Sequence, residues 1–420
     1  MKNKFVTTAV FVFILLLSLK PALADSDDHY SEYISTLEKL SGKKFTPIII
    51  QELEEYRRLF PDASNVDQML FRLASIYSER NDKVLSFYTH LKLLYLYPHS
   101  EHVTKSKDRL RSLLIEDKKF KPLKDQVETI VNPGVPDSTK AGALYAFLKD
   151  VYGFDFQPVK KLLIDSAAHF IKDFPNSVYR DEVTFWHAEL LTQDKQYELA
   201  LAEYMKLTFL FSKSLYVSAS KLRMADIFSN KLKMHQNAII TLEEFLLEYP
   251  DDPQAALAQL NMAHIIEKKK KKPLEAIEAY TTVAKKYPQS VEAVPALFEA
   301  ARIYEKKFKE YEQAIRIYNE VVRDFSKDLK APYALAEAAR VYEKHLKDSH
   351  NAANVYFKVY GLYPTSTIAA ESLFAAAEIS EKKLEDPERA LRYYRFVVEQ
   401  YPESKMAAKA SKRIEKLTSN

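Results

Sequence analysis

The chain has 420 residues, of which 62 are lysine or arginine and 58 are aspartate or glutamate, so its formal net charge at pH 7 is +4. Three of the lysines fall within the first 20 residues and the remaining charges nearly balance, which argues against a nucleic-acid-binding protein. The sequence contains no cysteine, which excludes disulfides, thiolate metal sites, a cysteine nucleophile and a lipidated cysteine.

Residues 1–24 have the pattern of a secretory signal peptide. Two lysines open the segment, residues 5–17 form an apolar core, and residues 22–24 read Ala-Leu-Ala, a small-residue cleavage site. The alternative is an uncleaved membrane anchor. That alternative is disfavoured because the apolar run is shorter than the ~20 residues that a spanning helix needs. We therefore expect cleavage after Ala24 and no transmembrane span in the mature chain.

Residues 25–175 are predicted to form degenerate helical repeats. Pro61 and Pro98 each follow an aromatic residue, as the boundaries between later units do, whereas Pro133 follows an asparagine. Because proline cannot continue a helix, these positions mark the ends of helices. The spacing between them is less regular than in the rest of the chain.

Residues 176–402 repeat with a period of 38 residues, and each unit reads as two helices. Six alanines mark the period: Ala200, Ala238, Ala276, Ala314, Ala352 and Ala390. A large side chain follows four residues after each of them: Tyr204, Leu242, Tyr280, Tyr318, Tyr356 and Tyr394. A fixed period of this length predicts stacked helix pairs, that is, an α-solenoid.

The boundaries between units are well marked. The second helix is predicted to end on an aromatic residue, usually followed by proline: Tyr97, Phe174, Phe211, Tyr249, Tyr287, Phe325, Tyr363 and Tyr401. Two positions past each proline position stands a serine or aspartate, whose side chain we expect to cap the next helix: Ser100, Ser177, Ser214, Asp252, Ser290, Asp328, Ser366 and Ser404. Residues 403–420 are predicted to form a lysine-rich capping helix.

The alanine, the aromatic residue four later and the proline twelve later resemble the second helix of a tetratricopeptide repeat. The usual unit has about 34 residues, and we place the additional residues in the first helix and the internal turn. The Tyr-Pro-x-Ser boundary, as at residues 287–290, is similar to a variant in bacterial envelope proteins, among them outer-membrane-assembly lipoproteins and periplasmic cell-division coordinators.

This resemblance implies an all-α fold: a right-handed, tetratricopeptide-like α-solenoid of antiparallel helix pairs. It also implies the periplasm of a Gram-negative bacterium as the location of the mature chain. The lipoproteins that it resembles depend on a lipidated cysteine, which this chain lacks. Direct lipid anchoring to the outer membrane is therefore not expected.

The sequence has few features of an active site. Its five glycines do not form a phosphate-binding loop, and it has neither a His-Glu-x-x-His pair nor a serine in a nucleophile elbow. The densest histidine cluster, His99 and His102, lacks a third metal ligand at suitable spacing. Trp186 is interpreted as a packing residue. We therefore expect no enzymatic activity, no cofactor and no metal site.

The turn inside each regular unit is basic. Four of these turns contain Glu267-Lys268-Lys269, Glu305-Lys306-Lys307, Glu343-Lys344-His345 and Glu381-Lys382-Lys383. One interpretation is a strip that attracts anionic partners, such as lipid head groups or acidic peptides. The alternative is that the lysines only complement the helix dipole and keep the turn soluble.

The first helices face the concave side in the proteins that this chain resembles. Six residues there are predicted to contact a partner: Arg302, Arg340, Lys306, Lys344, His264 and Phe298. The two arginines are one repeat apart, and arginine binds a carboxylate through two parallel hydrogen bonds, so with the two lysines they are predicted to hold a peptide carboxylate. The alternative is local ion pairing, because glutamates lie three residues before and after each arginine.

These observations favour a periplasmic protein–protein interaction scaffold that binds a peptide or protein partner in cell-envelope assembly. The alternative is a structural subunit of a membrane-associated secretion or outer-membrane assembly complex. An enzyme is the least favoured class, because no segment outside the repeats is left to form a catalytic domain. The sequence does not name the partner.

Overall fold

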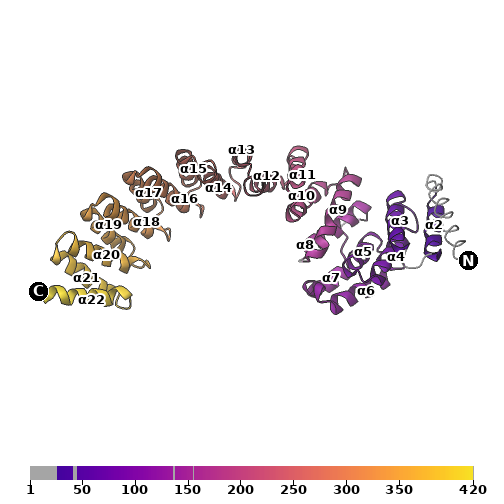
Figure 1. Cartoon of the computed structure of the whole chain (residues 1–420), viewed down its shortest axis with the longest axis horizontal. Helices are drawn as coiled ribbons and strands as arrows, with labels where there is room; N and C mark the ends of the chain where they lie inside the picture. Colours follow the sequence, from indigo (N-terminus) through magenta and orange to yellow (C-terminus); the bar gives the residue numbers. More distant parts are fainter. Residues whose placement is uncertain (1–25, 41–44, 136–137, 155, 420) are drawn as a thin grey trace, which may run out of the picture. The chain divides into compact units, whose positions relative to one another are not determined.

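The computed structural model describes residues 26–40, 45–135, 138–154 and 156–419. The predicted signal peptide and its cleavage site after Ala24 lie outside these described residues. Within the described ranges the regular structure is helical throughout and contains no strand, which confirms the predicted all-α fold (Figure 1). The chain divides into two compact units, residues 1–217 and 218–420. From the sequence we divided the chain between residues 175 and 176, where degenerate repeats give way to regular ones. That boundary stays a prediction.

The N-terminal unit is a succession of helices, most of which pack against the next one in the chain, while residues 140–153 pack against residues 83–96 and 157–173. They are α2 (Asp27–Leu40), α3 (Thr46–Leu59), α4 (Val66–Glu79), α5 (Lys83–Leu96), α6 (Val103–Glu116), the 3₁₀ segment η2 (Lys118–Gln126), α7 (Val127–Val131), α8 (Lys140–Gly153), α9 (Gln157–Asp173), α10 (Arg180–Gln193) and α11 (Tyr197–Leu210). The repeat is degenerate around Pro133, where η2 and the short α7 occupy the place of a full second helix.

The C-terminal unit repeats one helix pair. Its helices are α12 (Val217–Asp226), the π segment η3 (Ile227–Lys231), α13 (His235–Glu248), α14 (Ala255–Lys268), α15 (Pro273–Lys286), α16 (Ala293–Ile303), η4 (Tyr304–Phe308), α17 (Tyr311–Asp324), α18 (Ala331–Val341), η5 (Tyr342–Leu346), α19 (Ser349–Leu362), α20 (Ala369–Lys382), α21 (Pro387–Gln400) and α22 (Lys405–Thr418). From α13 to α22 each helix packs against the next, as expected for an α-solenoid.

Small residues at fixed positions bring the two helices of a pair into close contact. The six periodic alanines, from Ala200 to Ala390, are fully buried. Tyr280 and Tyr394, four residues after their alanines, are also fully buried. An alanine at this position leaves room for the neighbouring helix, and the tyrosine fills the space between successive pairs. The 38-residue period thus corresponds to one repeated core layer.

The predicted aromatic boundaries are confirmed. Each of the eight aromatic residues, from Tyr97 to Tyr401, is the residue that directly follows the last helical residue of a second helix. Trp186 is also a packing residue, because it is buried and stacks on Tyr145 and Tyr152 with ring centroids 5.6 and 5.4 Å apart.

The predicted capping by the serine or aspartate after each boundary is wrong at most positions. Ser404 does cap a helix, because its Oγ accepts a hydrogen bond from the N–H of Ala407 at 3.1 Å. At six other boundaries the side chain accepts from the N–H two residues later, as in the bond from Lys330 to Asp328 at 2.7 Å, whereas the buried Oγ of Ser290 has no partner among the described residues. These side chains therefore close a turn in the loop before the helix begins.

The turn inside each pair of the C-terminal unit has one recurring geometry. The N–H of Glu310 donates to the C=O of Tyr304, six residues earlier, at 3.0 Å, and the same bond recurs one repeat later. The residue before Glu310 is Lys309, whose φ of 57° lies in the left-handed region. In three pairs the end of the first helix also widens into a π segment: η3, η4 and η5. These widened turns lie in the segment where we placed the additional residues.

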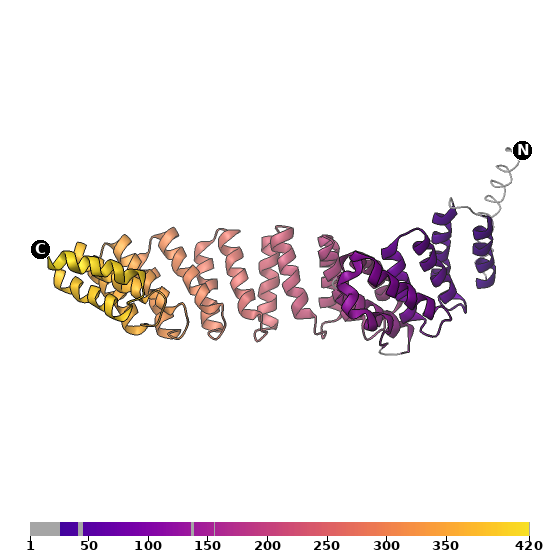
Figure 2. The same ribbon diagram turned by 90° about the horizontal axis from the view of Figure 1, so that it is seen from below.

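The alternation of helices gives the C-terminal unit two faces and two edges. We call α14, α16, α18 and α20 the A helices, and α15, α17, α19 and α21 the B helices. In Figure 1 the labels of α16, α18 and α20 lie on the inner side of the curve that this unit traces, and those of α15, α17 and α19 lie outside them. Because the helices alternate in direction, all A–B turns lie at one edge and all inter-pair loops at the opposite edge (Figure 2).

Candidate functional site

The A helices of the C-terminal unit present one repeated stripe of partly exposed side chains, which we call the A-face. Its positions lie three, four and seven residues apart on α14 and α18, and on α16 two of them precede the third by four and three residues, so they share one side. The members of the stripe are Leu257, Leu260 and His264 on α14, Phe298, Glu299 and Arg302 on α16, and Tyr333, Glu337 and Arg340 on α18. Of the six predicted contact residues, four lie on this face.

Arg302 is held between two glutamates of different helix pairs. Its Nε donates to Glu299 at 2.6 Å within the same helix, and its Nη2 donates to Glu267 on the preceding A helix at 2.5 Å. The carboxylate of Glu267 also accepts a hydrogen bond from the Tyr280 hydroxyl at 2.9 Å. Burial opposes ionisation of Glu267, but the hydrogen bonds from Arg302 and Tyr280 outweigh it and hold the pKa of this carboxyl below its usual value.

Arg340 repeats the arrangement one pair later. Its Nε donates to Glu337 at 2.7 Å, and its Nη2 donates to Glu305 at 2.6 Å. The predicted local pairing is therefore correct for the glutamate before each arginine. It is wrong for Glu305, which binds the arginine of the next helix pair rather than Arg302. The two arginines thus link consecutive A helices.

Towards the C-terminus, a different basic residue forms the ion pair that links one helix pair to the next. The position that holds arginine on α16 and α18 holds Glu378 on α20. There Lys383 binds Glu343 at 3.1 Å, and Arg413 of α22 binds Glu381. The glutamate before the basic turn is therefore the constant member of the link, while the cation that reaches it varies.

The remaining predicted contact residues differ in how available they are. Lys306 and Lys344 are exposed and form no ion pair with any other described residue. His264 is half-buried with its ring edge-on to Tyr280, and burial lowers the pKa of the imidazole below its usual value. Phe298 is half-buried against Tyr318, with ring centroids 5.5 Å apart. The two lysines are thus the cations most accessible to a partner at this site.

The structure adds two A-face residues that our sequence analysis missed. Leu257 and Tyr333 each expose 41% of their surface, although both are large and hydrophobic. They occupy the same position of the repeat, two periods apart, and this periodicity would have identified them. Together with Leu260 and Phe298 they make the part of the A-face near the inter-pair loops apolar.

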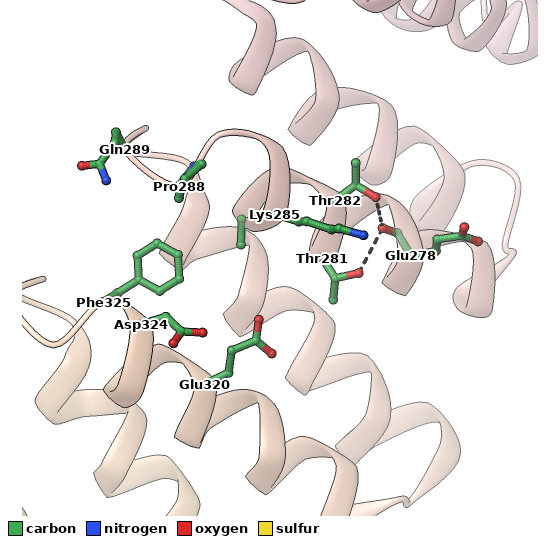
Figure 3. A pocket seen from close by; sticks show the side chains of 10 residues that line it. Glu278, Thr281, Thr282, Lys285, Pro288, Gln289, Glu320, Asp324 and Phe325 are labelled. Carbon is green, nitrogen blue, oxygen red and sulfur yellow. Dashed lines mark hydrogen bonds between the residues drawn. The ribbon is translucent and has the colours of Figure 1, made fainter.

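The B helices carry a separate hollow of about 570 Å³ (Figure 3). It lies between α15 and α17, near the inter-pair loops, and Figure 3 shows Glu320 and Asp324 facing Lys285 and two threonines across it. The hydroxyls of Thr281 and Thr282 donate to backbone carbonyls of their own helix, and Asp324 pairs with Arg323. Burial, with a smaller contribution from Asp324, raises the pKa of Glu320. The hollow therefore presents carboxylates, and the predicted contact residues are not among those lining it.

Two further predictions concern metal binding and membrane insertion. His102 stacks on Phe71 with ring centroids 4.4 Å apart, so this histidine packs within the N-terminal unit. Among the described residues there is no group of histidines and carboxylates that fits a metal ion. In the same part of the chain, no helix combines the length and the apolar character needed to cross a membrane.

Comparisons with known proteins agree with the repeated helix pair. The profile of the tetratricopeptide repeat matches residues 219–252, 254–290, 295–328 and 371–404, all in the C-terminal unit. The pair α18 and α19 lies in the interval that the profile leaves out, yet it has the same turn and the same buried alanine. No curated protein matches the chain.

Several solved structures are similar to this chain. A tetratricopeptide repeat protein from Parabacteroides merdae is 16% identical, with 66% of this chain and 99% of that chain covered and a TM-score of 0.34. PilF from Pseudomonas aeruginosa is 17% identical, with 56% and 98% covered and a TM-score of 0.34. The C-terminal part of a repeat protein from Cytophaga hutchinsonii is 16% identical, with 63% and 98% covered and a TM-score of 0.38.

Proposed function

Because this chain is a tetratricopeptide-repeat protein, we propose that it is an exported, periplasmic scaffold that binds a peptide or protein partner during assembly of the cell envelope. The observation that carries this proposal is the A-face with its exposed apolar Leu257 and Tyr333, two periods apart, together with Lys306 and Lys344 in the turns that follow α16 and α18, which form no ion pair with any other described residue. A surface of this kind offers a partner both apolar contact and charge recognition along an extended segment. The proposed function involves no catalysis.

The export part of the proposal is supported by residues 1–24 of the sequence, which have a positive start, an apolar core and a small-residue site. Its test is fractionation of cells that produce the full chain or a variant beginning at residue 25. The full chain is expected in the periplasmic fraction with its first 24 residues removed, and the shortened variant in the cytoplasm. Mass spectrometry of an uncleaved chain in the membrane fraction would contradict export as a soluble protein.

The contact part of the proposal involves the predicted residues in two roles. Lys306 and Lys344 form no ion pair with the residues that the structure describes, so they are proposed to meet the carboxylates of the partner. Arg302 and Arg340 already bind two carboxylates each, so they are proposed to contact the partner only through the partly exposed edges of their guanidinium groups. His264 and Phe298 contribute ring surface beside the exposed Leu257 and Tyr333.

The test of partner binding uses two matched variants. The A-face variant carries Leu257→Ser and Tyr333→Ser, and the control carries Val291→Ser and Leu329→Ser, which are exposed aliphatic residues of the inter-pair loops. The tagged full chain and both variants are used to capture proteins from the envelope of the native cell. A partner held by the wild type and the control, but lost from the A-face variant, supports the proposal. Equal capture by both variants overturns the A-face assignment.

One observation favours the second candidate, a structural subunit of a membrane-associated assembly complex. The outward side of α11 exposes Leu199, Phe209 and Leu210, whereas the equivalent positions Glu275 and Lys285 of α15 are charged. Permanent interfaces are more apolar than transient ones. A constant, stoichiometric membrane partner that is lost on Phe209→Ser, while A-face variants retain it, would favour this candidate.

A further inference from the structure

The A–B turns of the C-terminal unit share an unusual backbone position. One residue in each turn has a positive φ: Lys233 (60°), Lys271 (56°), Lys309 (57°), Lys347 (57°) and Glu385 (50°). These residues are 38 positions apart, and four of the five are lysine. We call these four lysines the turn lysines.

Backbone conformation and the helix dipole do not explain why lysine recurs at these positions, although in the first turn Lys233 Nζ donates a hydrogen bond to the C=O of Asn230 at 2.7 Å. A left-handed residue is accommodated with less strain by glycine or asparagine, which are the usual residues there. Cations favour a helix C-terminus, but that effect falls off beyond the last turn. Lys268, Lys306 and Lys344 already occupy the ends of the A helices, before the left-handed position. Lysine at the left-handed position therefore adds positive charge at the outermost point of each turn, at a conformational cost.

These charges gather at one edge of the unit. The A–B turns all lie at the same edge, as the alternation of helices in Figure 2 requires. Residues 268–272 are five consecutive lysines, and Lys231, Lys306 and Lys307 extend the charge to the turns on either side. The nearby glutamates are already paired, Glu267 and Glu305 with Arg302 and Arg340, and Glu275 with Lys272 at 2.9 Å, which removes one of the five lysines from the available charge. One acidic residue also follows the lysine directly in the third and fourth turns, Glu310 and Asp348, and the last turn carries two, Glu385 and Asp386.

Two exposed apolar side chains accompany the basic turns. Met234 directly follows the first turn lysine and exposes 43% of its surface, and Leu274 follows the five lysines and exposes 64%. Lysines with exposed aliphatic side chains between them are typical of surfaces that lie against an anionic bilayer. The lysines interact with phosphate groups there, while the apolar side chains enter the boundary between head groups and acyl chains.

The geometry points to a membrane-docking edge: the turns around Lys233, Lys271 and Lys309 bind the surface of an anionic phospholipid bilayer, with Met234 and Leu274 entering its head-group layer. A bilayer surface fits a row of turns that project from helix ends. An extended acidic peptide would need a groove, and the hollow between α15 and α17 lies near the inter-pair loops, at the opposite edge. The turn lysines, Met234 and Leu274 are not among the residues proposed to contact the partner, so changing them tests the docking edge without removing a proposed partner contact.

The test measures sedimentation of the purified full chain with vesicles. One set of vesicles is phosphatidylcholine alone and the other is phosphatidylcholine mixed with phosphatidylglycerol. The docking variant carries Lys233→Asn, Lys271→Asn, Lys309→Asn and Lys347→Asn, because asparagine is well tolerated at a positive φ and the fold is retained. The wild type is expected to prefer the anionic vesicles, and the docking variant to bind them about tenfold more weakly or worse.

Two controls separate this edge from general positive charge. The variant with Lys285, Lys286, Lys327 and Lys330 changed to glutamine removes the same number of charges away from the A–B turns and is expected to bind as the wild type does. Glu385→Asn makes the same backbone change without removing a positive charge, so binding must not fall. A third variant, Met234→Ser with Leu274→Ser, is expected to lose the binding that remains at high salt.

Three outcomes overturn the inference. The first is equal binding of the wild type to neutral and anionic vesicles. The second is an equal loss of binding in the docking variant and the four-glutamine control, since that shows a response to net charge alone. The third is binding of soluble polyglutamate through the turn lysines without binding of anionic vesicles, which would identify an acidic polypeptide instead.

Discussion

Arg302 binds Glu267 across the boundary between two helix pairs, with Nη2 of the guanidinium 2.5 Å from Oε1 of the carboxylate. The two residues are 35 positions apart in the sequence but lie on neighbouring A helices. Glu267 also accepts the Tyr280 hydroxyl of its own pair, so a single carboxylate connects both helices of one pair to the next pair. The residues that we first considered for partner binding therefore also hold the repeats together.

Arg302→Ala is expected to lower the free energy of unfolding by about 1–3 kcal/mol. The reason is that the side chain of Glu267, of which only 6% is exposed, loses its closer ion-pair partner and keeps only Lys268 at 3.6 Å. This loss in the free energy of unfolding is smaller than that expected for a fully buried ion pair, because the Arg302 side chain is 26% exposed to solvent. Urea denaturation of the full chain, followed by circular dichroism, measures the difference.

The control for this prediction is Arg316→Ala. Arg316 is an exposed arginine of α17, and its removal is expected to change stability by less than about 0.5 kcal/mol. Arg302→Lys keeps the charge but lacks the separate Nε and Nη2 donors that bind the two glutamates. The stability of this variant is therefore expected to lie between those of the wild type and Arg302→Ala. Equal unfolding midpoints for Arg302→Ala and Arg316→Ala would show that the link between pairs contributes no stability.

The stability of the C-terminal unit is expected to depend on pH through Glu267. Hydrogen bonds from Arg302 and Tyr280 outweigh burial and hold the pKa of this carboxyl in the folded chain below its usual value of 4.5. A lowered pKa means that the stabilisation is complete well above pH 4.5 and is lost as the pH falls towards the folded-state value. Urea denaturation at a series of pH values, from about 7 to about 3, tests this sign.

Comparison of variants isolates the contribution of Glu267 from that of the other carboxylates. Glu267→Gln is expected to be less stable at neutral pH and to lose less stability on acidification than the wild type. Glu278→Gln, at an exposed position of α15, is expected to follow the wild-type curve. A curve for Glu267→Gln that runs parallel to the wild-type curve would refute the assignment.

The periodic residues made the fold predictable from the sequence. Ala314 and Phe325 recur at one spacing in consecutive units, and this spacing alone indicated the buried face and the end of the second helix. The capping role of Asp328 was wrong because a turn separates it from the helix start, and the sequence pattern does not show how many loop residues come before a helix.

The interactions of the candidate site were harder to predict, for two reasons. The pairing of Arg302 with Glu267 depends on how two helix pairs stack, whereas sequence spacing reveals neighbours only within one helix. The left-handed conformation of Lys309 was missed because lysine, unlike glycine or asparagine, does not indicate a positive φ. In both cases the repeat period locates the residue, but its conformation and its partner come from the three-dimensional structure.

Ala314→Trp is expected to destabilise the C-terminal unit by at least ~1–3 kcal/mol, because overpacking a closely packed core displaces its neighbours. Ala314 is fully buried, and every regular unit has an alanine at its position. Arg316→Trp introduces the same side chain at an exposed position of the same helix and is expected to have little effect. Thermal unfolding of both variants tests this contrast, and similar midpoints would mean that the repeat register is wrongly assigned.

Lys309→Gly is expected to raise the free energy of unfolding, although glycine usually destabilises a protein. The left-handed conformation costs an ordinary residue roughly 1–2 kcal/mol, and glycine avoids this cost but loses roughly 0.5–1 kcal/mol through the greater entropy of the unfolded chain. The net gain is therefore about 0.5–1 kcal/mol. Glu310→Gly is the matched control, because Glu310 has a φ of −88° and gains nothing from glycine, so this variant is expected to be less stable than the wild type.

The same gain is expected at the other turn lysines. Lys271→Gly and Lys347→Gly have the same backbone geometry as Lys309→Gly, with φ values of 56° and 57°. The three changes lie in different helix pairs and share no side-chain contacts, so their effects should add within about 0.5 kcal/mol. Urea denaturation of the single and triple variants measures this sum. A triple variant less stable than the wild type would show that these lysines stabilise the fold through interactions of their side chains, and that their place in the turns does not require a membrane-docking role.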